Sequence, residues 1–561
     1  MIKIYKLLNK NQKKKVFNLI LLILLLSFCE VLTFYLLTPI INYFSASANN
    51  PVDINFFGIN NVSLKSLVIF FLLIFFIRCL ISIIISSYRG KLVKDVNDDL
   101  SQRIYSNYLN QDYIFFLKKN SSNLISNLIN QIDNFSYRVL DNFILLFTES
   151  VVVISIISYL LFAYFKGSLI LIFTILFFFT LLFTKFKSEF KKLGSKKVIH
   201  DSYKINDLQK SFHIIQNIKL DNLENFFIKK FEKNTKLSSK SYFFLQVLTE
   251  IPRPLIELIF LTIIFFIMYI FFYYLYLSKA DILSMMAIFG VSIFRLLPSC
   301  NKIMNCSNVV KYYSLTVDVI FNEINNLKTK IIPIGDCTFD DSITLENINF
   351  CYPETNKIIL NNVNLTIKKN DIVGIKGASG SGKSTLLNII SYLLKPDSGK
   401  MYIDKILIKN VFSAYQKKIG YVSQKTYLTE ESLLENIALG VEKTDIDYNL
   451  LEEVIKKSNL DKFIRELPLG KNTLLGEKGS WLSGGQQQRI GIARALYKKP
   501  EILILDEATN ALDEKSELEI FNTIQNLKNT MTVIIVSHKK TLFDFCDKVF
   551  ELKNGLLSKI K

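Results

Sequence analysis

Six long runs of apolar residues restrict what the first part of this chain can fold into. In order along the 561 residues, they occupy 16–44, 67–88, 143–165, 168–184, 255–277 and 282–310. About 20 helical residues cross the ~30 Å hydrocarbon layer of a membrane, and lipid offers no hydrogen-bond partner to an open backbone. The runs therefore predict six membrane-spanning helices. The fourth run is short, and we expect its helix to continue beyond the membrane.

The segments between these runs differ in length and charge. Residues 45–66, 166–167 and 278–281 are short and carry little charge, whereas residues 90–142 and 185–250 are long, charged and rich in lysine. Six lysines and no acid lie among the first 15 residues, and the cytoplasmic flanks of membrane helices are enriched in Lys and Arg. We therefore expect the N-terminus and both long segments in the cytoplasm, where the periodicity of the long segments predicts helical extensions.

The formal net charge of +19 raises the question of a nucleic-acid partner, because basic proteins often bind phosphate backbones. The positive charge follows the membrane topology instead, so no nucleic-acid partner is predicted. The seven cysteines show no metal-binding spacing, and we expect free thiols rather than a disulfide framework. The first apolar run lacks a small-residue cleavage site, which predicts a retained helix rather than a removed signal peptide.

A glycine-rich loop, GASGSGKS at residues 377–384, lies between a strand-like run at 372–375 and a helix-like run at 386–394. This context is typical of a P-loop, in which glycines let backbone N–H groups turn toward phosphates. We expect Lys383 to reach the β- and γ-phosphates of a nucleotide and Ser384 to bind Mg²⁺. The predicted nucleotide contacts are Gly377, Ser379, Gly380, Ser381, Gly382, Lys383, Ser384 and Thr385.

Two acids end the apolar run ILILDE at residues 502–507. Such a run predicts a buried parallel strand, which delivers Asp506 and Glu507 to its carboxyl end. We expect Asp506 to hold Mg²⁺ and Glu507 to act as the general base toward water. Acids that merely end a strand are the alternative, which the neighbouring P-loop disfavours.

The segment LSGGQQQR at residues 482–489 resembles the signature sequence of ATP-binding cassette (ABC) proteins, and the other motifs of that family follow in order. The resemblance covers residues 340–561 and implies ATP and Mg²⁺ as cofactors. It implies that Tyr352 stacks on adenine and that Gln424 senses the γ-phosphate beside the metal. It also implies that Asp513, at the end of NALD, lies in the D-loop and that His538 is the switch histidine. The motif NALD departs from the family pattern, since it has Asn510 where Ser is usual.

The signature residues lie where a helix is predicted to begin, and exposed N–H groups with the helix dipole favour anions there. They cannot easily reach the nucleotide of their own P-loop, about 100 residues away, so we expect them to serve the nucleotide of another subunit. One P-loop and one signature per chain then imply a homodimer that closes over two ATP molecules. The residues concerned are Ser483, Gly484, Gly485 and Gln486.

A cassette fused behind six helices resembles the ABC exporter class, whose activity is ATP hydrolysis coupled to transport. The fold class expected is therefore multi-domain: an all-α six-helix transmembrane domain followed by an α/β P-loop nucleotide-binding domain. We predict the transmembrane domain, with two long intracellular loops, at residues 1–318, a linker at 319–340 and the cassette at 341–561.

Charged residues inside the predicted spans are the best guide to the substrate, because each is costly in lipid unless it is paired or hydrated. Structural ion pairs, for instance between Glu30 and Arg78, are one interpretation. The other is a hydrated cavity for an anionic head group, because two helices carry polar faces with arginines. On the sixth predicted helix the polar face comprises Ser292, Arg295, Ser299, Lys302 and Cys306.

The segments FCEVLTFYLLTPII, IPRPLIE and FRLLPSCNKIM resemble the half-transporters of bacterial glycan loci, above all the lipid-linked oligosaccharide flippases of N-glycosylation. That resemblance implies a polyprenyl-diphosphate glycan, moved across the bacterial inner membrane to the periplasmic side. It implies that Arg78, Arg253 and Arg295 contact the diphosphate. The first external loop departs from that family, because it is short and rich in Asn where the family has an amphipathic helix.

Two alternatives remain at the level of the sequence. The first is export of another amphipathic compound, such as a drug, a peptide or a lipid, although a peptide-processing exporter would carry a protease domain before the first helix. The second is a channel or sensor that does not transport, which the presence of Glu507 and His538 disfavours.

Overall fold

The structure is a computed structural model. It describes residues 2–45, 64–273, 279–326, 335–353, 357–476, 481–507, 525, 530–537 and 540–561. It divides into two compact units, which are described separately below. The first unit comprises Met1–Gln111 and Phe115–Thr329, and the second comprises Asp112–Ile114 and Lys330–Lys561. The first external loop lies largely outside the described residues, and so does the prediction made for it.

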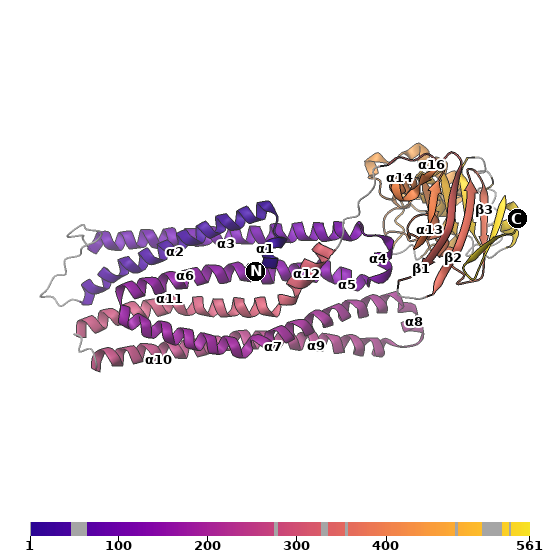
Figure 1. Ribbon diagram of the computed structural model, residues 1–561. Helices are drawn as coiled ribbons and strands as arrows, with labels where there is room; N and C mark the ends of the chain where they lie inside the picture. The colour runs from indigo at the N-terminus through magenta and orange to yellow at the C-terminus, as the bar shows by residue number, and fades with distance from the viewer. Residues whose placement is uncertain are drawn as a thin grey trace. The chain divides into compact units, whose positions relative to one another are not determined.

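The first unit is built from helices. The long ones are α2 (Lys10–Ser45), α3 (Leu64–Leu109), α6 (Asp141–Ala163), α7 (Phe165–His213), α9 (Glu224–Glu250), α10 (Pro252–Tyr273), α11 (Lys279–Tyr312) and α12 (Ser314–Asn326). Shorter helices are α1 (Ile2–Leu7), α5 (Ser121–Ser126), α8 (Ile215–Leu220) and two π-helical stretches, η1 (Asn127–Gln131) and η2 (Asn134–Leu140). The short helix α4 (Tyr113–Lys118) begins with two residues of the second unit and continues in the first. Figure 1 shows the long helices running alongside one another, with α2 next to α3, α6 next to α11 and α7 next to α9.

The six predicted spans fall in α2, α3, α6, α7, α10 and α11. Within the described residues, four helical stretches are long and apolar enough to cross a membrane: Lys10–Ile41, Leu64–Leu109, Ser121–Ala163 and Met285–Tyr312. The other two predicted spans lie in α7 and α10, where many side chains are outside the described set. Large apolar side chains such as Phe162 and Phe294, which are 90% and 84% exposed, suit contact with lipid.

Two helices confirm that predicted spans continue as long extensions. Helix α3 has 46 residues and α7 has 49. At 1.5 Å per residue each is about 70 Å long, more than twice the thickness of the hydrocarbon layer. Their apolar halves therefore account for a membrane crossing, and their charged halves extend beyond it.

A glycine permits one close contact between these helices. A Cβ atom added at Gly194 of α7 would lie 1.8 Å from the carbonyl oxygen of Tyr312, the last residue of α11. The side chain of Tyr312 is 1% exposed. The two backbones can approach this closely only because residue 194 lacks a side chain.

The second unit contains two sheets. A four-stranded antiparallel sheet has the order β2-β1-β4-β5, and a six-stranded sheet has the order β10-β9-β3-β8-β7-β6. The first is formed by β1 (Ser342–Cys351), β2 (Ile358–Lys368), β4 (Ser398–Ile403) and β5 (Ile406–Leu407). The second is formed by β3 (Ile372–Lys376), β6 (Ile419–Val422), β7 (Ile502–Asp506), β8 (Thr532–Val536), β9 (Lys548–Lys553) and β10 (Leu556–Lys559). Helices of this unit include α13 (Lys383–Ile390), α15 (Leu433–Ile437), α16 (Tyr448–Lys457) and α18 (Gly484–Tyr497).

Five strands of the larger sheet, β9, β3, β8, β7 and β6, run parallel. Every residue of β7 and β8 is buried, as expected for parallel strands covered on both faces. Because β3, β7 and β8 are adjacent and parallel, the glycine-rich loop after β3 and the acids after β7 lie at one edge of the sheet. Ligands of open α/β sheets bind at this carboxyl edge.

Candidate functional site

The glycine-rich loop joins β3 to α13 as predicted. Gly380 and Gly382 have φ angles of 77° and 103°, a left-handed conformation that glycine adopts without strain. A Cβ atom at Gly382 would also lie 2.9 Å from Ile359 Cγ2. Both glycines are therefore required by the turn that leads into the helix.

Lys383 is the first residue of α13, and only 5% of it is exposed. Its Nζ donates hydrogen bonds to the carbonyl oxygens of Gly377 and Ala378, each at 3.0 Å. The same nitrogen lies 3.8 Å from a carboxylate oxygen of Glu507. The loop thus curls around a buried cation at the carboxyl edge of the sheet.

Asp506 ends β7, and its side chain meets two hydroxyl groups. Ser384 Oγ lies 3.5 Å from one carboxylate oxygen, and the hydroxyl of Tyr421 donates to the other at 3.0 Å. Burial raises the pKa of Asp506 above its usual value, although hydrogen bonds from Tyr421 and Ser384 oppose this effect. Tyr421 is a contact that the sequence analysis missed. The sequence alone gave no signal for this contact, because it depends on the pairing of β6 with β7.

Glu507 faces a different partner. Its φ angle is 49°, a conformation that non-glycine residues rarely adopt, and its amide donates to Val536 at 3.0 Å. Gln424 Nε2 donates to its carboxylate at 2.7 Å. Unusual backbone conformations of this kind concentrate at functional sites. The structure therefore brings Lys383, Glu507 and Gln424 together.

Tyr352 lies near the start of α13, the helix that follows the glycine-rich loop. Its hydroxyl is 3.2 Å from Thr385 Oγ1, and its ring packs edge-on against Phe350. Two predicted residues, Asp513 and His538, lie outside the described residues. The structure leaves their predicted roles untested.

The signature segment begins a helix, as predicted. Ser483 is the N-cap of α18: its hydroxyl accepts from the Gln486 amide, and the Gln486 side chain accepts from the Ser483 amide at 2.8 Å. This capping box fixes the first turn, while the amides of Gly484 and Gly485 remain at the exposed helix start. Such a terminus favours an anion.

The polar groups around the glycine-rich loop fit a nucleotide with Mg²⁺. The hydroxyl of Ser381, in the middle of the loop, is buried and has no hydrogen-bond partner among the described residues. Lys383 offers a buried cation, and Ser384 and Asp506 offer two oxygen donors of the kind that Mg²⁺ prefers. Mg²⁺ is usually held by one or two protein oxygens together with substrate phosphates, and this small donor set suits such binding.

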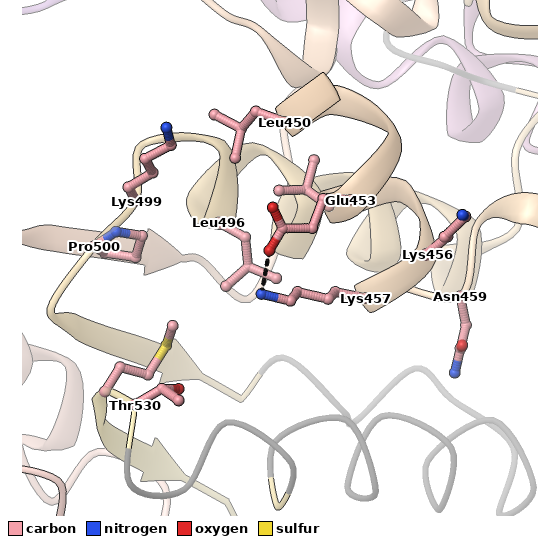
Figure 2. A pocket seen from close by; sticks show the side chains of 11 residues that line it. Leu450, Glu453, Lys456, Lys457, Asn459, Leu496, Lys499, Pro500 and Thr530 are labelled. Carbon is pink, nitrogen blue, oxygen red and sulfur yellow. Dashed lines mark hydrogen bonds and ion pairs between the residues drawn. The ribbon is translucent and has the colours of Figure 1, made fainter. Parts of the chain in front are cut away.

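A cavity of about 460 Å³ lies elsewhere on the second unit (Figure 2). It is lined by Lys456, Lys457 and Lys499 and by Glu453, which pairs with Lys457. Pro500 and Thr530, also in its lining, precede β7 and β8. The cavity is therefore at the amino ends of these strands, and no predicted site residue lines it.

In the first unit, two of the predicted substrate residues meet at one carboxylate. Arg78 of α3 and Arg295 of α11 contact Glu30 of α2 at 2.9 and 2.6 Å. The third, Arg253, pairs instead with Glu257 one turn along its own helix, at 3.2 Å. The structure brings Arg78 and Arg295 together and does not bring Arg253 to Glu30.

The polar face predicted on the sixth span, now α11, contacts a second acid. Ser299 and Lys302 donate to the two oxygens of Glu149, a residue of α6, at 2.7 and 2.9 Å. Glu149 is 6% exposed. Side chains of α11 therefore contact both of these buried acids, Glu30 and Glu149.

A helical unit followed by a P-loop unit with a signature helix defines the ABC transporter architecture. The family model "ABC transporter transmembrane region" matches residues 16–296, and the model "ABC transporter" matches residues 360–510. The chain therefore belongs to the ABC transporter family.

Relatives and solved structures agree with this assignment. The chain is 36% identical over 289 residues to "ABC transporter B family member 29, chloroplastic" of Arabidopsis thaliana, a match that covers 51% of this chain and 45% of that protein. It is 28% identical over 526 residues to an export ATP-binding/permease protein of Rickettsia typhi, with 90% and 88% coverage. A bacterial Atm1-family ABC exporter with ATP bound has the same fold, with a TM-score of 0.80, 18% identity and coverage of 97% and 94%.

The chain spans less than half of the length of the first relatives that it matches: 45% of the Arabidopsis protein and 16% of "ABC transporter B family member 2" of Dictyostelium discoideum. The matched part of the Dictyostelium protein is 225 residues long, and the identity is 40%.

Proposed function

We propose that this chain is one half of an ATP-driven exporter, an ATPase coupled to transport, that works as a homodimer in the bacterial inner membrane. The observation that carries the proposal is the convergence of Lys383, Asp506 and the Glu507–Gln424 pair at the carboxyl edge of the sheet. In a chain of the ABC transporter family, this arrangement fits ATP hydrolysis. The proposed division is a membrane domain at 1–318, a linker at 319–340 and a cassette at 341–561, with the N-terminus and the cassette in the cytoplasm.

ATP with Mg²⁺ supplies the phosphoanhydride bond whose hydrolysis drives the cycle. The proposed hydrolytic roles rest on the contacts described above. Lys383 would neutralise phosphate charge, and Ser384, Asp506 and Gln424 would hold Mg²⁺, which would offset further charge on the phosphates. Glu507 accepts a proton from the attacking water, and its bond to Gln424 holds the carboxylate in place.

The remaining roles of the predicted residues rest on the family motifs. Tyr352 stacks on adenine, and the loop from Gly377 through Thr385 binds the phosphates. Asp513 and His538 complete the site from the D-loop and the switch region. The segment from Ser483 to Gln486 binds the nucleotide of the partner subunit, because one chain carries one P-loop and one signature.

For the substrate we propose a lipid-linked oligosaccharide with a polyprenyl-diphosphate anchor. Two guanidinium groups meet at Glu30 inside the helical unit, and Arg binds phosphate oxygens in bidentate fashion. Export of another amphipathic compound is the second candidate. Arg253 favours this second candidate, because its side chain is 68% exposed and pairs with Glu257. It therefore does not join Arg78 and Arg295 as the diphosphate proposal expects.

The test is stimulation of ATP hydrolysis by the proposed substrate. In the purified protein we expect a polyprenyl-diphosphate oligosaccharide to raise the rate, and we expect Arg295→Ala to lose this response while basal hydrolysis remains. Arg103→Ala is the matched control, because Arg103 pairs with Asp99 one turn away on α3. An unaltered response in Arg295→Ala would remove Arg295 from substrate binding and leave it as a structural ion pair.

A further inference from the structure

One carboxylate oxygen of Glu30 forms ion pairs with two arginines on two different helices. Arg295 donates its Nε at 3.1 Å and an Nη at 2.6 Å, and the Nε of Arg78 lies 2.9 Å from the same oxygen, Oε1. The Glu30 side chain is 1% exposed, whereas those of Arg78 and Arg295 are 18% and 27% exposed. The carboxylate is therefore the buried anchor, and the guanidinium groups are the more accessible part.

The charges of this cluster do not balance. Two guanidinium groups carry two positive charges and Glu30 carries one negative charge, so one positive charge remains. The other buried acid that side chains of α11 contact is Glu149 of α6, and its two oxygens are bound to Ser299 and Lys302. A one-to-one pair would leave no such excess, as between Arg89 and Asp141, which meet at 2.9 Å. An excess charge inside a helical bundle is costly until an anion binds to it.

The two arginines also carry more N–H donors than the Glu30 carboxylate accepts. A guanidinium group has five N–H donors, so the two arginines carry ten. Glu30 accepts hydrogen bonds from two of them, both on Arg295, and the Nε of Arg78 lies 2.9 Å away. A diphosphate presents several anionic oxygens that two guanidinium forks can bind side by side. A monophosphate offers fewer oxygens to the pair, and a neutral or cationic amphiphile gains nothing from the excess charge.

We propose that Glu30 is the specificity-determining residue of the substrate site. It holds Arg78 and Arg295 together as one double-guanidinium site with a single excess charge, which selects a diphosphate. Glu30 also repels the bound anion, and this repulsion keeps binding weak enough for release. The inference rests on the proposed function, because it assigns the selectivity of that same site.

The test compares the concentration of undecaprenyl diphosphate that half-stimulates ATP hydrolysis in the wild-type protein and in Glu30→Gln. Removing the negative charge strengthens anion binding, so we expect the half-stimulating concentration to fall by roughly tenfold in Glu30→Gln. Asp141→Asn is the matched control. It removes a carboxylate from the one-to-one pair with Arg89, and we expect a change of less than about twofold.

A second measurement needs no variant and covers the case in which Glu30→Gln does not fold. In the wild-type protein we expect undecaprenyl diphosphate to act at a concentration roughly tenfold lower than undecaprenyl monophosphate, and undecaprenol not to act. Equal responses to the three lipids would overturn the inference.

The outcomes separate the inference from the function on which it rests. A wild-type response to the diphosphate with an unchanged or higher half-stimulating concentration in folded Glu30→Gln would overturn the role of Glu30 alone. Active ATP hydrolysis without any response to the diphosphate would overturn the proposed substrate, and the inference with it.

Discussion

Asp506 and Glu507 are neighbours in the chain, yet their side chains meet different partners. Asp506 ends a buried strand and is held by the hydroxyls of Ser384 and Tyr421. The left-handed backbone of Glu507 directs its carboxylate to Gln424 and toward Lys383. Asp506 thus lies beside the hydroxyl that we propose to bind Mg²⁺, and Glu507 lies beside an amide that can hold its carboxylate toward a water molecule.

The first prediction concerns Glu507→Gln. The amide keeps the shape of the side chain but cannot accept a proton, so we expect ATP hydrolysis to fall by about 10²–10⁴-fold while ATP binding persists. Turnover of ATP and retention of bound ATP measure the two effects. Glu501→Gln is the control, since Glu501 pairs with Lys418 at the other end of β7. Near-normal turnover in Glu507→Gln would assign the base to another group.

The second prediction concerns Asp506→Asn. Because burial raises the pKa of Asp506, the folded protein holds this proton more tightly than the unfolded chain does. That contribution to stability is present at low pH and is lost as the pH rises through the raised pKa. At neutral pH the ionised carboxylate therefore destabilises the nucleotide-free protein. We expect Asp506→Asn to unfold at the same or a higher temperature, and to lose Mg²⁺-dependent hydrolysis.

Thermal unfolding of the nucleotide-free protein at pH 7.5 and at about pH 4, near the ordinary pKa of an aspartate, checks this sign. The advantage of Asp506→Asn over the wild type should be larger at the higher pH. A variant that unfolds several degrees earlier than the wild type at pH 7.5 would contradict the account of Asp506.

At the scale of helices and strands, sequence patterns predicted those elements whose geometry is set by residues close together in the chain. The glycine-rich loop between a strand and a helix, the buried strand before Asp506 and the helix start at Ser483 were all predicted and confirmed. Periodicity also placed Arg295, Ser299 and Lys302 on one face of α11. These features depend on residues within about a dozen positions of one another.

Contacts between distant elements could not be predicted in the same way. A helical period assigns a residue to a face, but it does not say which helix that face meets. The sequence offered the ion pair of Glu30 with Arg78 as one interpretation, and the structure contains it. The added contact of Arg295 with Glu30 was not predicted, because it depends on how α2, α3 and α11 pack. Tyr421 was missed for the same reason, because only the strand order β7-β6 brings it to Asp506.

The third prediction concerns Gly194, where α7 and α11 meet. In Gly194→Ala the new methyl group would lie 1.8 Å from the backbone oxygen of Tyr312, so the helices must separate. We expect a loss of folded protein and a lower unfolding temperature, since overpacking typically costs about 1–3 kcal/mol. Gly290→Ala on α11 is the matched control, because a Cβ atom there meets nothing within 4 Å. Equal stability of the two variants would contradict the close contact.

At the scale of the whole molecule, the chain joins a helical unit with a buried cluster of charges to an α/β unit with a nucleotide site. Neither unit accounts for the proposed function alone, because the proposed substrate site and the proposed ATP site lie in different units. The P-loop and the signature helix described here are one of each, which agrees with the proposed homodimer. We therefore propose that ATP hydrolysis in one unit moves a substrate through the other.

The most direct test is the transfer of a labelled polyprenyl-diphosphate oligosaccharide across the bilayer of proteoliposomes. Its accessibility to a membrane-impermeant reagent is followed with and without ATP, and Glu507→Gln is the control. We predict ATP-dependent transfer with the wild-type protein and none with Glu507→Gln. Normal ATP hydrolysis without any transfer would contradict the proposed substrate, and transfer at the same rate without ATP would contradict an ATP-driven exporter.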